Sequence, residues 1–329
     1  MYPSHLDDHS PAIPVSTTRA DSRFREAGRG DTLERPNAPH LDGRLSGLDK
    51  PGRPGRGILN RRRTPPGFEN RTNDGLSWQI HSPRRISVVG MKGGVGKTTL
   101  SILTSTAIAR ATRLPVLLLD SDTTYGSLML RTGLAPRASA DDLARMGDPG
   151  DLRVLGSAVS QTKDGVWVIP SGRTPAQSAA FGEAGYVAAV RAVYRHFPVM
   201  VTDCGAGLAG PLMHRVISAS HSLVIATAPS MDSLLASYNT LEWLESIGYA
   251  ELARRSIIAI SNVDPANPRI DLAETRRRFA ALAGDVVVIG SDPHLAPGSV
   301  LDYDALSEPT RAAARCLAGS ALAAALGAA

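Results

Sequence analysis

From residue 84 onward, short apolar runs alternate with longer stretches in which apolar residues recur about every three to four positions. The runs are closed by glycine, serine, aspartate or asparagine, as is typical of buried strands that end in turns. Seven runs predict strands, at 84–91, 114–120, 165–172, 197–205, 222–230, 255–263 and 284–292. Helices are expected between and after them, at 98–110, 186–195, 230–247, 272–283 and 311–329.

This alternation predicts the fold class. Strand–helix–strand units are joined by right-handed crossovers, which make neighbouring strands parallel and place helices on both faces of the sheet. We therefore expect an α/β fold with a mostly parallel sheet of seven or eight strands, in one domain over residues 84–329.

The first 83 residues have a different pattern, rich in Pro, Gly, Arg, Asp and Ser and without sustained periodicity. Such a segment cannot bury enough apolar surface to offset its conformational entropy, so we predict a disordered arm over 1–83. Within it, residues 53–63 contain five arginines and no acidic residue. This run is either a docking arm for an anionic surface or a solvated linker.

Composition narrows the class of protein only slightly. A net charge of +5 permits binding to nucleic acid or to an acidic membrane without requiring it. The two cysteines, Cys204 and Cys316, lie far apart, which argues against a disulfide scaffold and fits a reducing compartment. No apolar run approaches the roughly 18 residues of a membrane span, and the N-terminus does not read as a signal peptide. We expect a cytoplasmic protein with no integral membrane segment.

Residues 90–98 satisfy the pattern G-x-x-x-x-G-K-[ST] between the first predicted strand and a helix. In such a P-loop, glycines let backbone N–H groups converge on phosphate oxygens, and the helix N-terminus favours negative charge. Lys97 is expected at the β- and γ-phosphates and Thr98 on Mg²⁺. The predicted ligand is ATP with Mg²⁺, bound by Gly93, Gly94, Val95, Gly96, Lys97, Thr98 and Thr99.

Other polar residues follow the strands and should meet the loop, because ligands bind at the carboxyl edge of a parallel sheet. Asp203 has the Walker B arrangement that holds Mg²⁺, and Asp122 is placed to orient or deprotonate the attacking water. The predicted metal set is therefore Thr98, Asp122 and Asp203. Asp120 either joins this site or caps a turn. Asn262 either pairs with the adenine edge or forms a turn.

These residues resemble those of the ParA/MinD family of deviant-Walker ATPases. "KGGVGKTT" at 92–99 is similar to that family's signature loop, "DSD" at 120–122 to its switch I and "DCGAG" at 203–207 to its switch II. The resemblance runs from residue 85 to about residue 310. The segments "DCGAG", "WLESIGY" and "DPHLAPG", with the long arm, look closest to the MinD-like ATPases encoded with type VII (ESX) secretion systems.

The resemblance implies roles for particular residues. The chain has only four lysines, and two of them lie in this loop. In the family the extra lysine, here Lys92, reaches across a face-to-face ATP-bound homodimer to the partner's phosphates; alternatively, it only adds positive potential near its own. The implied catalytic residues are Lys92, Lys97 and Asp122, and Pro293 is implied to lie against the nucleotide. The ATPase is expected to be slow unless a partner stimulates it.

Three functions remain open from the sequence. The first is an ATP-dependent switch that regulates or positions a larger assembly, such as a type VII secretion machine, through a protein partner. The second is a ParA-like partition ATPase that binds DNA non-specifically through Arg269, Arg276, Arg277 and Arg278. The third is a poorly hydrolysing ATP-dependent scaffold. The first two imply recruitment of a cytoplasmic protein to the membrane or the nucleoid.

Overall fold

The computed structural model describes residues 80–124, 126–264, 266 and 269–328. The predicted arm, apart from residues 80–83, lies outside the described residues.

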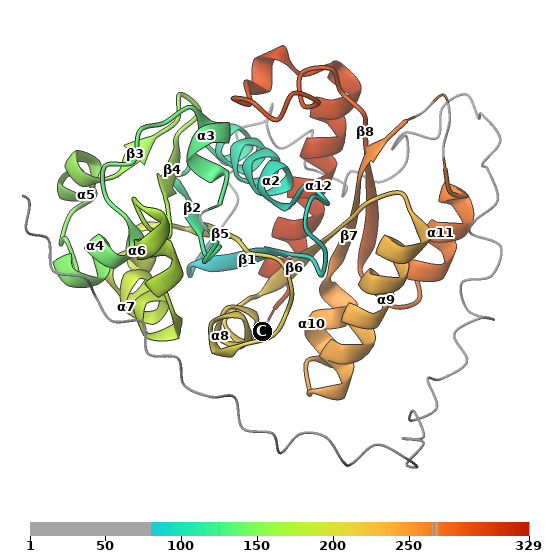
Figure 1. Ribbon diagram of the computed structural model, residues 1–329, viewed down its shortest axis with the longest axis horizontal. Coiled ribbons are helices and arrows are strands. Elements are labelled where there is room, and N and C mark those ends of the chain that lie inside the picture. Colours follow the sequence, from blue (N-terminus) through green and yellow to red (C-terminus); the bar gives the residue numbers. More distant parts are fainter. Residues whose placement is uncertain (1–79, 125, 265, 267–268, 329) are drawn as a thin grey trace, which may run out of the picture. The chain divides into compact units, whose positions relative to one another are not determined.

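The predicted sheet is confirmed (Figure 1). The described strands form one eight-stranded sheet in the order β3-β4-β2-β5-β1-β6-β7-β8, in which β3 pairs antiparallel with β4 and the other neighbours are parallel. All seven predicted runs contain a strand. The strands are β1 Arg84–Val89, β2 Val116–Asp120, β3 Ser160–Gln161, β4 Val166–Ile169, β5 Val199–Asp203, β6 Ser222–Thr227, β7 Ile257–Val263 and β8 Asp285–Gly290. The unpredicted strand, β3, has only two residues, which is too short to produce a period.

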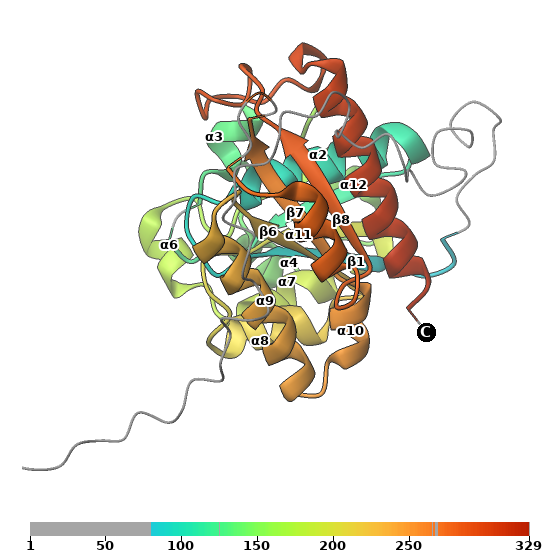
Figure 2. The ribbon, with the colours of Figure 1, turned by 90° about the vertical axis from the view of Figure 1, so that its right-hand side faces the viewer.

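The α-helices of the described residues cover both faces of the sheet. They are α2 Lys97–Thr112, α3 Leu128–Thr132, α4 Ala140–Met146, α5 Leu152–Ala158, α6 Pro175–Ala180, α7 Glu183–Val193, α8 Pro211–Ser218, α9 Met231–Ser246, α10 Ala250–Arg255, α11 Leu272–Phe279 and α12 Glu308–Leu326. Helices α2 and α12 pack side by side on one face, while α8, α9 and α10 lie on the other (Figures 1 and 2).

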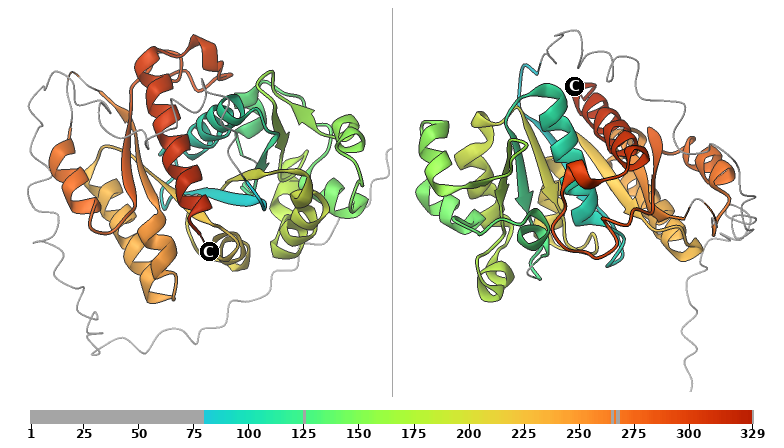
Figure 3. Two further views of the ribbon diagram at one scale, coloured as in Figure 1. Left: turned by 180° about the vertical axis from the view of Figure 1, so that it is seen from behind. Right: turned by 90° about the horizontal axis from the view of Figure 1, so that it is seen from above.

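Helix α12 begins three residues before the position predicted from the sequence. Ser307 is its N-cap and Pro309 lies in its first turn, where proline is tolerated because that N–H has no helical partner. Its small residues let it pack closely on α2, and Ala314, Ala318 and Ala321 are completely buried. Seen from behind and from above, this pair of helices covers the middle of the sheet (Figure 3).

Residues 291–307 connect β8 to α12, and we call them the crossing segment. The backbone N–H of Leu301 donates to the carbonyl of Arg131 in α3, at 2.7 Å. Within the segment, His294 Nε2 accepts the N–H of Asp302 at 3.0 Å. Asp292, nearly buried, accepts the backbone N–H and the hydroxyl of Ser307 at 3.0 and 2.8 Å. The segment is therefore fixed both to itself and to α3.

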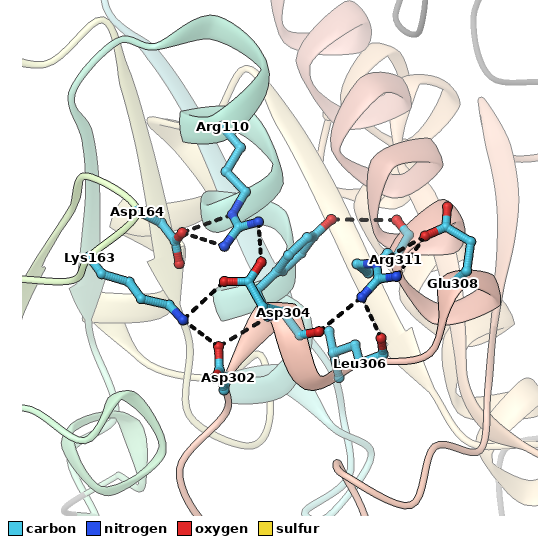
Figure 4. Close-up of polar contacts among 9 residues, drawn as sticks. Arg110, Lys163, Asp164, Asp302, Asp304, Leu306, Glu308 and Arg311 are labelled. Carbon is cyan, nitrogen blue, oxygen red and sulfur yellow. Dashed lines mark hydrogen bonds and ion pairs between the residues drawn. The ribbon is translucent and has the colours of Figure 1, made fainter.

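The end of the crossing segment is also held by a network of ion pairs (Figure 4). Arg110 at the end of α2 pairs with Asp304 and with Asp164, each at 2.6 Å, and its guanidinium lies 4.6 Å from the ring centre of Tyr303. Lys163, beside Asp164, pairs with Asp304 at 3.0 Å and with a second carboxylate of the segment. Single exposed ion pairs contribute little, but several that share partners fix a geometry.

Candidate functional site

A cavity of about 560 Å³ opens at the carboxyl edge of the sheet. Its walls come from the loop between β1 and α2, the loop after β2 and the loop after β5, which the sequence predicted would meet. The lining residues include Gly93, Gly94, Gly96, Lys97, Thr98, Thr99, Asp122 and the Cys204–Gly207 stretch. Of the residues predicted to bind phosphate, Val95 is the one outside this lining; its side chain is buried beneath the loop.

The glycine loop has the backbone that the motif requires. Gly94 and Gly96 have φ angles of 75° and 89°, in the left-handed region that favours glycine. Gly96 precedes α2, and a β-carbon there would lie 2.9 Å from the hydroxyl oxygen of Ser261. That hydroxyl donates to the carbonyl of Val95 at 2.8 Å. The β7 strand therefore supports the loop from below, and only glycine fits between them.

Lys97 begins α2 and is only 9% exposed. Its Nζ donates to the carbonyl of Lys92 at 3.0 Å, across the loop. Burial lowers its pKa, while the charges of Asp203 and Asp122 oppose that shift. The loop thus holds an ammonium group inside the cavity, where phosphate oxygens would stabilise its charged form.

Asp203 ends β5 and is buried; it is not itself a lining residue of the cavity, but Cys204, which follows it, is. Burial raises its pKa to about 6, an effect reduced by hydrogen bonds from Thr98 and Ser101 and by the charge of Lys97. The Ser101 hydroxyl donates to Asp203 Oδ1 at 2.9 Å. A hydroxyl and a carboxylate are hard oxygen ligands, so Thr98 and Asp203 together fit a magnesium ion.

Asp122 and Asp120 are two residues apart but have different environments. Asp122 lines the cavity, and its Oδ1 accepts the N–H and the hydroxyl of Thr124 at 2.8 and 2.6 Å. Asp120 is 2% exposed and accepts the N–H of Asp122 at 2.8 Å, while burial, followed by the charge of Asp203, raises its pKa well above the usual value. Of the two roles open for Asp120, the geometry supports the turn-forming one: it holds the turn that presents Asp122.

Lys92 lies in the same loop but outside the cavity lining. Its side chain is 39% exposed and forms an ion pair with Asp232 in the first turn of α9. The pair, with a hydrogen bond from Ser230, lowers the pKa of Asp232 to about 2. The neighbouring Met91 is 46% exposed. The side chain of Lys97 therefore lies in the cavity, whereas that of Lys92 lies on the surface.

A second hollow, of about 420 Å³, lies on the other side of Gly94. Asn262 lines it together with Ser230, Ser261 and Arg269. Asn262 has a φ of 58°, the left-handed conformation that asparagine adopts in turns, so it forms a turn and also borders the hollow. Pro293 is exposed and is not among the lining residues; the adenine contacts of Asn262 and Pro293 stay predictions.

The arginines predicted to contact DNA do not form one exposed row. Arg276 is half-buried, while Arg277 and Arg278 both pair with Glu274 on their own helix, α11. Arg269 lies apart from them, at the second hollow. DNA binding by this group stays a prediction, and its geometry gives it little support. Within the described ranges, no helix combines the length and apolarity that crossing a membrane requires.

Sequence reasoning missed several residues that line the cavity, among them Ser127, the N-cap of α3, and Arg131 within α3. Helix α3 has only five residues, so it gives no helical period in the sequence. No motif marks either residue, and only the fold places them beside Asp122.

Comparison with known proteins identifies a family model and solved structures that are similar to this chain. A family model described as the CobQ/CobB/MinD/ParA nucleotide binding domain matches residues 86–288. The cell division ATPase MinD of Pyrococcus furiosus has a similar fold, with a TM-score of 0.58 and 22% identity over 72% of this chain and 97% of that one. The septum site-determining protein MinD of Pyrococcus horikoshii, solved with Mg-ADP, gives a TM-score of 0.57 and 19% identity over 73% and 94%.

Among curated sequences, the ESX-1 secretion-associated protein EspI of Mycobacterium tuberculosis is 29% identical over 224 residues. The match covers 68% of this chain but only 34% of EspI, so the chain spans about a third of that relative's length.

Proposed function

The chain belongs to the CobQ/CobB/MinD/ParA nucleotide-binding family, and from that premise we propose that it is an ATP-driven molecular switch. ATP binds with Mg²⁺ in the cavity at the carboxyl edge of the sheet, two ATP-bound copies associate face to face, and hydrolysis separates them. The observation that carries this proposal is the opposite placement of the two loop lysines, with Lys97 inside the cavity and Lys92 on the surface beside it.

The residues at the cavity have different roles in binding and hydrolysis. Lys97 and the N-terminus of α2 bind the phosphates, since both direct positive charge into the cavity. Thr98 and Asp203 hold Mg²⁺, which supplies neutralisation of the phosphate charge when bound. Asp122 orients the attacking water, and Asp120 keeps Asp122 in place through its backbone N–H. Gly205 permits this approach, because a β-carbon there would lie 3.1 Å from Asp122 Oδ1.

The surface lysine supplies the link between association and hydrolysis. Its ion pair with Asp232 is exposed, and exposed pairs contribute little to stability, so Lys92 can readily exchange Asp232 for a phosphate. In a face-to-face dimer, Lys92 leaves Asp232 and contacts the nucleotide of the partner copy. A cation delivered in this way stabilises the transition state only when two copies meet, so turnover depends on dimerisation. Met91 supplies apolar area to the same face.

The assembly that this switch serves is proposed from its relative. Similarity to EspI, whose name associates it with ESX-1 secretion, favours a role in regulating or positioning a type VII secretion machine through a protein partner. The partition role is less favoured, because Arg277 is the exposed member of the α11 run while Arg276 and Arg278 are partly buried, so the run presents no row of exposed arginines.

Sedimentation with ADP–Mg²⁺ and with ATP–Mg²⁺ tests the switch. We expect the wild type and Asp122→Ala to dimerise with ATP, and Lys92→Ala to remain monomeric and to turn over at least about tenfold more slowly. Lys163→Ala is the matched control, since it also removes a partly exposed, ion-paired lysine, but away from the cavity. A wild type that stays monomeric with ATP bound contradicts the trans contact.

Turnover of the wild type, alone and with candidate partners, separates a switch from a scaffold. An ATP-bound dimer with no turnover under any condition supports the scaffold. Plasmid retention at low salt that is lost at high salt would instead favour partition.

A further inference from the structure

Arg131 occupies a position in the cavity that none of the roles above uses. It lies in α3, one helical turn after Ser127, and the two side chains both line the cavity wall next to Asp122. Leu128, the first residue of α3, is completely buried and anchors the helix in the core. Figure 1 shows α3 beside α2, the helix that starts with Lys97.

The guanidinium of Arg131 is half-buried without a compensating charge. Burial alone lowers its pKa, and among the described residues no carboxylate forms an ion pair with it. Its Nε is shielded from solvent and has no hydrogen-bond partner. Other arginines close to the crossing segment are paired, as Arg110 and Arg311 are in Figure 4. Removing a cation from water without a partner costs free energy, and an anion in the cavity would offset that cost.

We propose that Arg131 binds the terminal phosphate of the triphosphate and so makes this cavity distinguish ATP from ADP. The inference rests on the proposed function, since it takes ATP as the ligand. Arg131 approaches from the same wall as Asp122, which orients the water that attacks the terminal phosphorus, whereas the glycine loop and Lys97 bind from another wall. A planar guanidinium can donate two parallel hydrogen bonds to one phosphate, which a lysine cannot do.

The surroundings of Arg131 give this contact a second consequence. Its backbone carbonyl accepts the N–H of Leu301, and its guanidinium lies 3.3 Å from where a β-carbon on Gly298 would sit. Gly133, which ends α3, would place its own β-carbon 3.0 Å from Val300. The crossing segment therefore packs against the C-terminal end of α3, at Arg131 and at Gly133. A γ-phosphate that draws in Arg131 restrains α3 and this segment together, and ADP does not.

The first test compares the affinities of Arg131→Met and Arg131→Lys for ATP–Mg²⁺ and ADP–Mg²⁺ by calorimetry. Methionine keeps the apolar part of the side chain without the charge. Lysine keeps the positive charge but lacks the planar guanidinium that donates two parallel hydrogen bonds. We expect Arg131→Met to bind ATP about 10- to 100-fold more weakly with ADP affinity changed less than about twofold, and Arg131→Lys to fall between. Arg137→Met is the control, because Arg137 is exposed and outside the cavity lining.

The second test uses the wild type and needs no variant to fold. Hydrogen exchange of α3 and of residues 291–307 should slow with a non-hydrolysable ATP analogue and not with ADP. Equal losses of ATP and ADP affinity in Arg131→Met, or equal exchange with both nucleotides, would overturn the assignment. A wild type that binds neither nucleotide would instead refute the proposed function, so the two failures are distinguishable.

Discussion

At Asp203, burial at the end of β5 opposes the negative charge that a magnesium ligand must carry. Its pKa of about 6 lies above the value of 3.8 in the unfolded chain. The folded protein therefore holds a proton that the unfolded chain releases, and this carboxyl lowers stability as pH rises from about 4 to about 6. Above that range the charge is present and unfavourable until a metal ion compensates it. The charged form of Asp203 therefore lowers the stability of the metal-free domain, and that same form is the one that binds a magnesium ion.

The pH dependence of nucleotide binding follows from this residue. We expect the affinity of the wild type for ATP–Mg²⁺ to weaken by up to about tenfold per pH unit below about pH 6, because protonated Asp203 is a poor metal ligand. Asp203→Asn should bind more weakly at pH 7.5 and lose that part of the dependence. Calorimetry from pH 5 to pH 7.5 measures both. Identical pH profiles would show that only the phosphates of the nucleotide titrate.

The sequence could place Lys97, Thr98 and Asp203 because their positions follow from strand ends and a loop motif. It left two roles open for Asp120. Asp120 ends β2 and Asp122 follows two residues later, and only the three-dimensional structure shows that the first is buried while the second lines the cavity. Arg131 was missed because its role depends on an unpaired charge, which is a property of its neighbours and not of its local sequence.

At the level of elements, the junction of the glycine loop and α2 depends on β7. A β-carbon at Gly96 would meet the Ser261 hydroxyl that holds the Val95 carbonyl, and the residue also has a positive φ. The glycine loop, the first turn of α2 and the end of β7 are therefore packed together. We expect β7 to support phosphate binding by fixing the loop backbone, without contacting a phosphate itself.

Gly96→Ala should consequently lower the free energy of unfolding by about 2–3 kcal/mol and abolish ATP binding, since both backbone strain and displacement of Ser261 contribute. Gly150→Ala separates the two effects. Gly150 also has a positive φ, 73°, but open space around it, so only about 1 kcal/mol of strain is expected there. Urea unfolding and nucleotide titration of both variants give the comparison. Equal losses in both variants would contradict the contact with β7.

Long, strongly patterned elements were predicted with small boundary errors, whereas short ones were not predicted. The run that became β1 is mostly apolar, and the stretch that became α2 is a 16-residue helix that the glycine loop opens, so both are evident in the sequence. Helix α3 and strand β3 have five and two residues and are held by tertiary contacts, so no local period announces them. Helix α11 ends at Phe279, four residues before its predicted end, and Gly284 then packs against the backbone of Arg254 and Arg255.

At the scale of the molecule, the site residues lie between positions 92 and 304, within the predicted domain of 84–329. The predicted boundary at residue 83 is therefore testable. A chain lacking residues 1–79 should bind ATP and dimerise with affinities within about twofold of the full chain, because described residues between Gly93 and Met213 line the cavity. Loss of ATP binding on truncation would place part of the site in the arm. Loss of partner binding alone would assign the arm its docking role.

The pairing of α2 with α12 has a consequence for synthesis. Helix α2 follows the first strand of the sheet, but the partner that covers it, α12, emerges about 200 residues later. The central strand β1 likewise pairs with β5 and β6, which are synthesised later. While the chain is still on the ribosome, the glycine loop and its helix are exposed without their cover, and long-range closure of this kind is slow. A nascent chain thus contains the glycine loop before the strands and helices that complete the cavity have been synthesised.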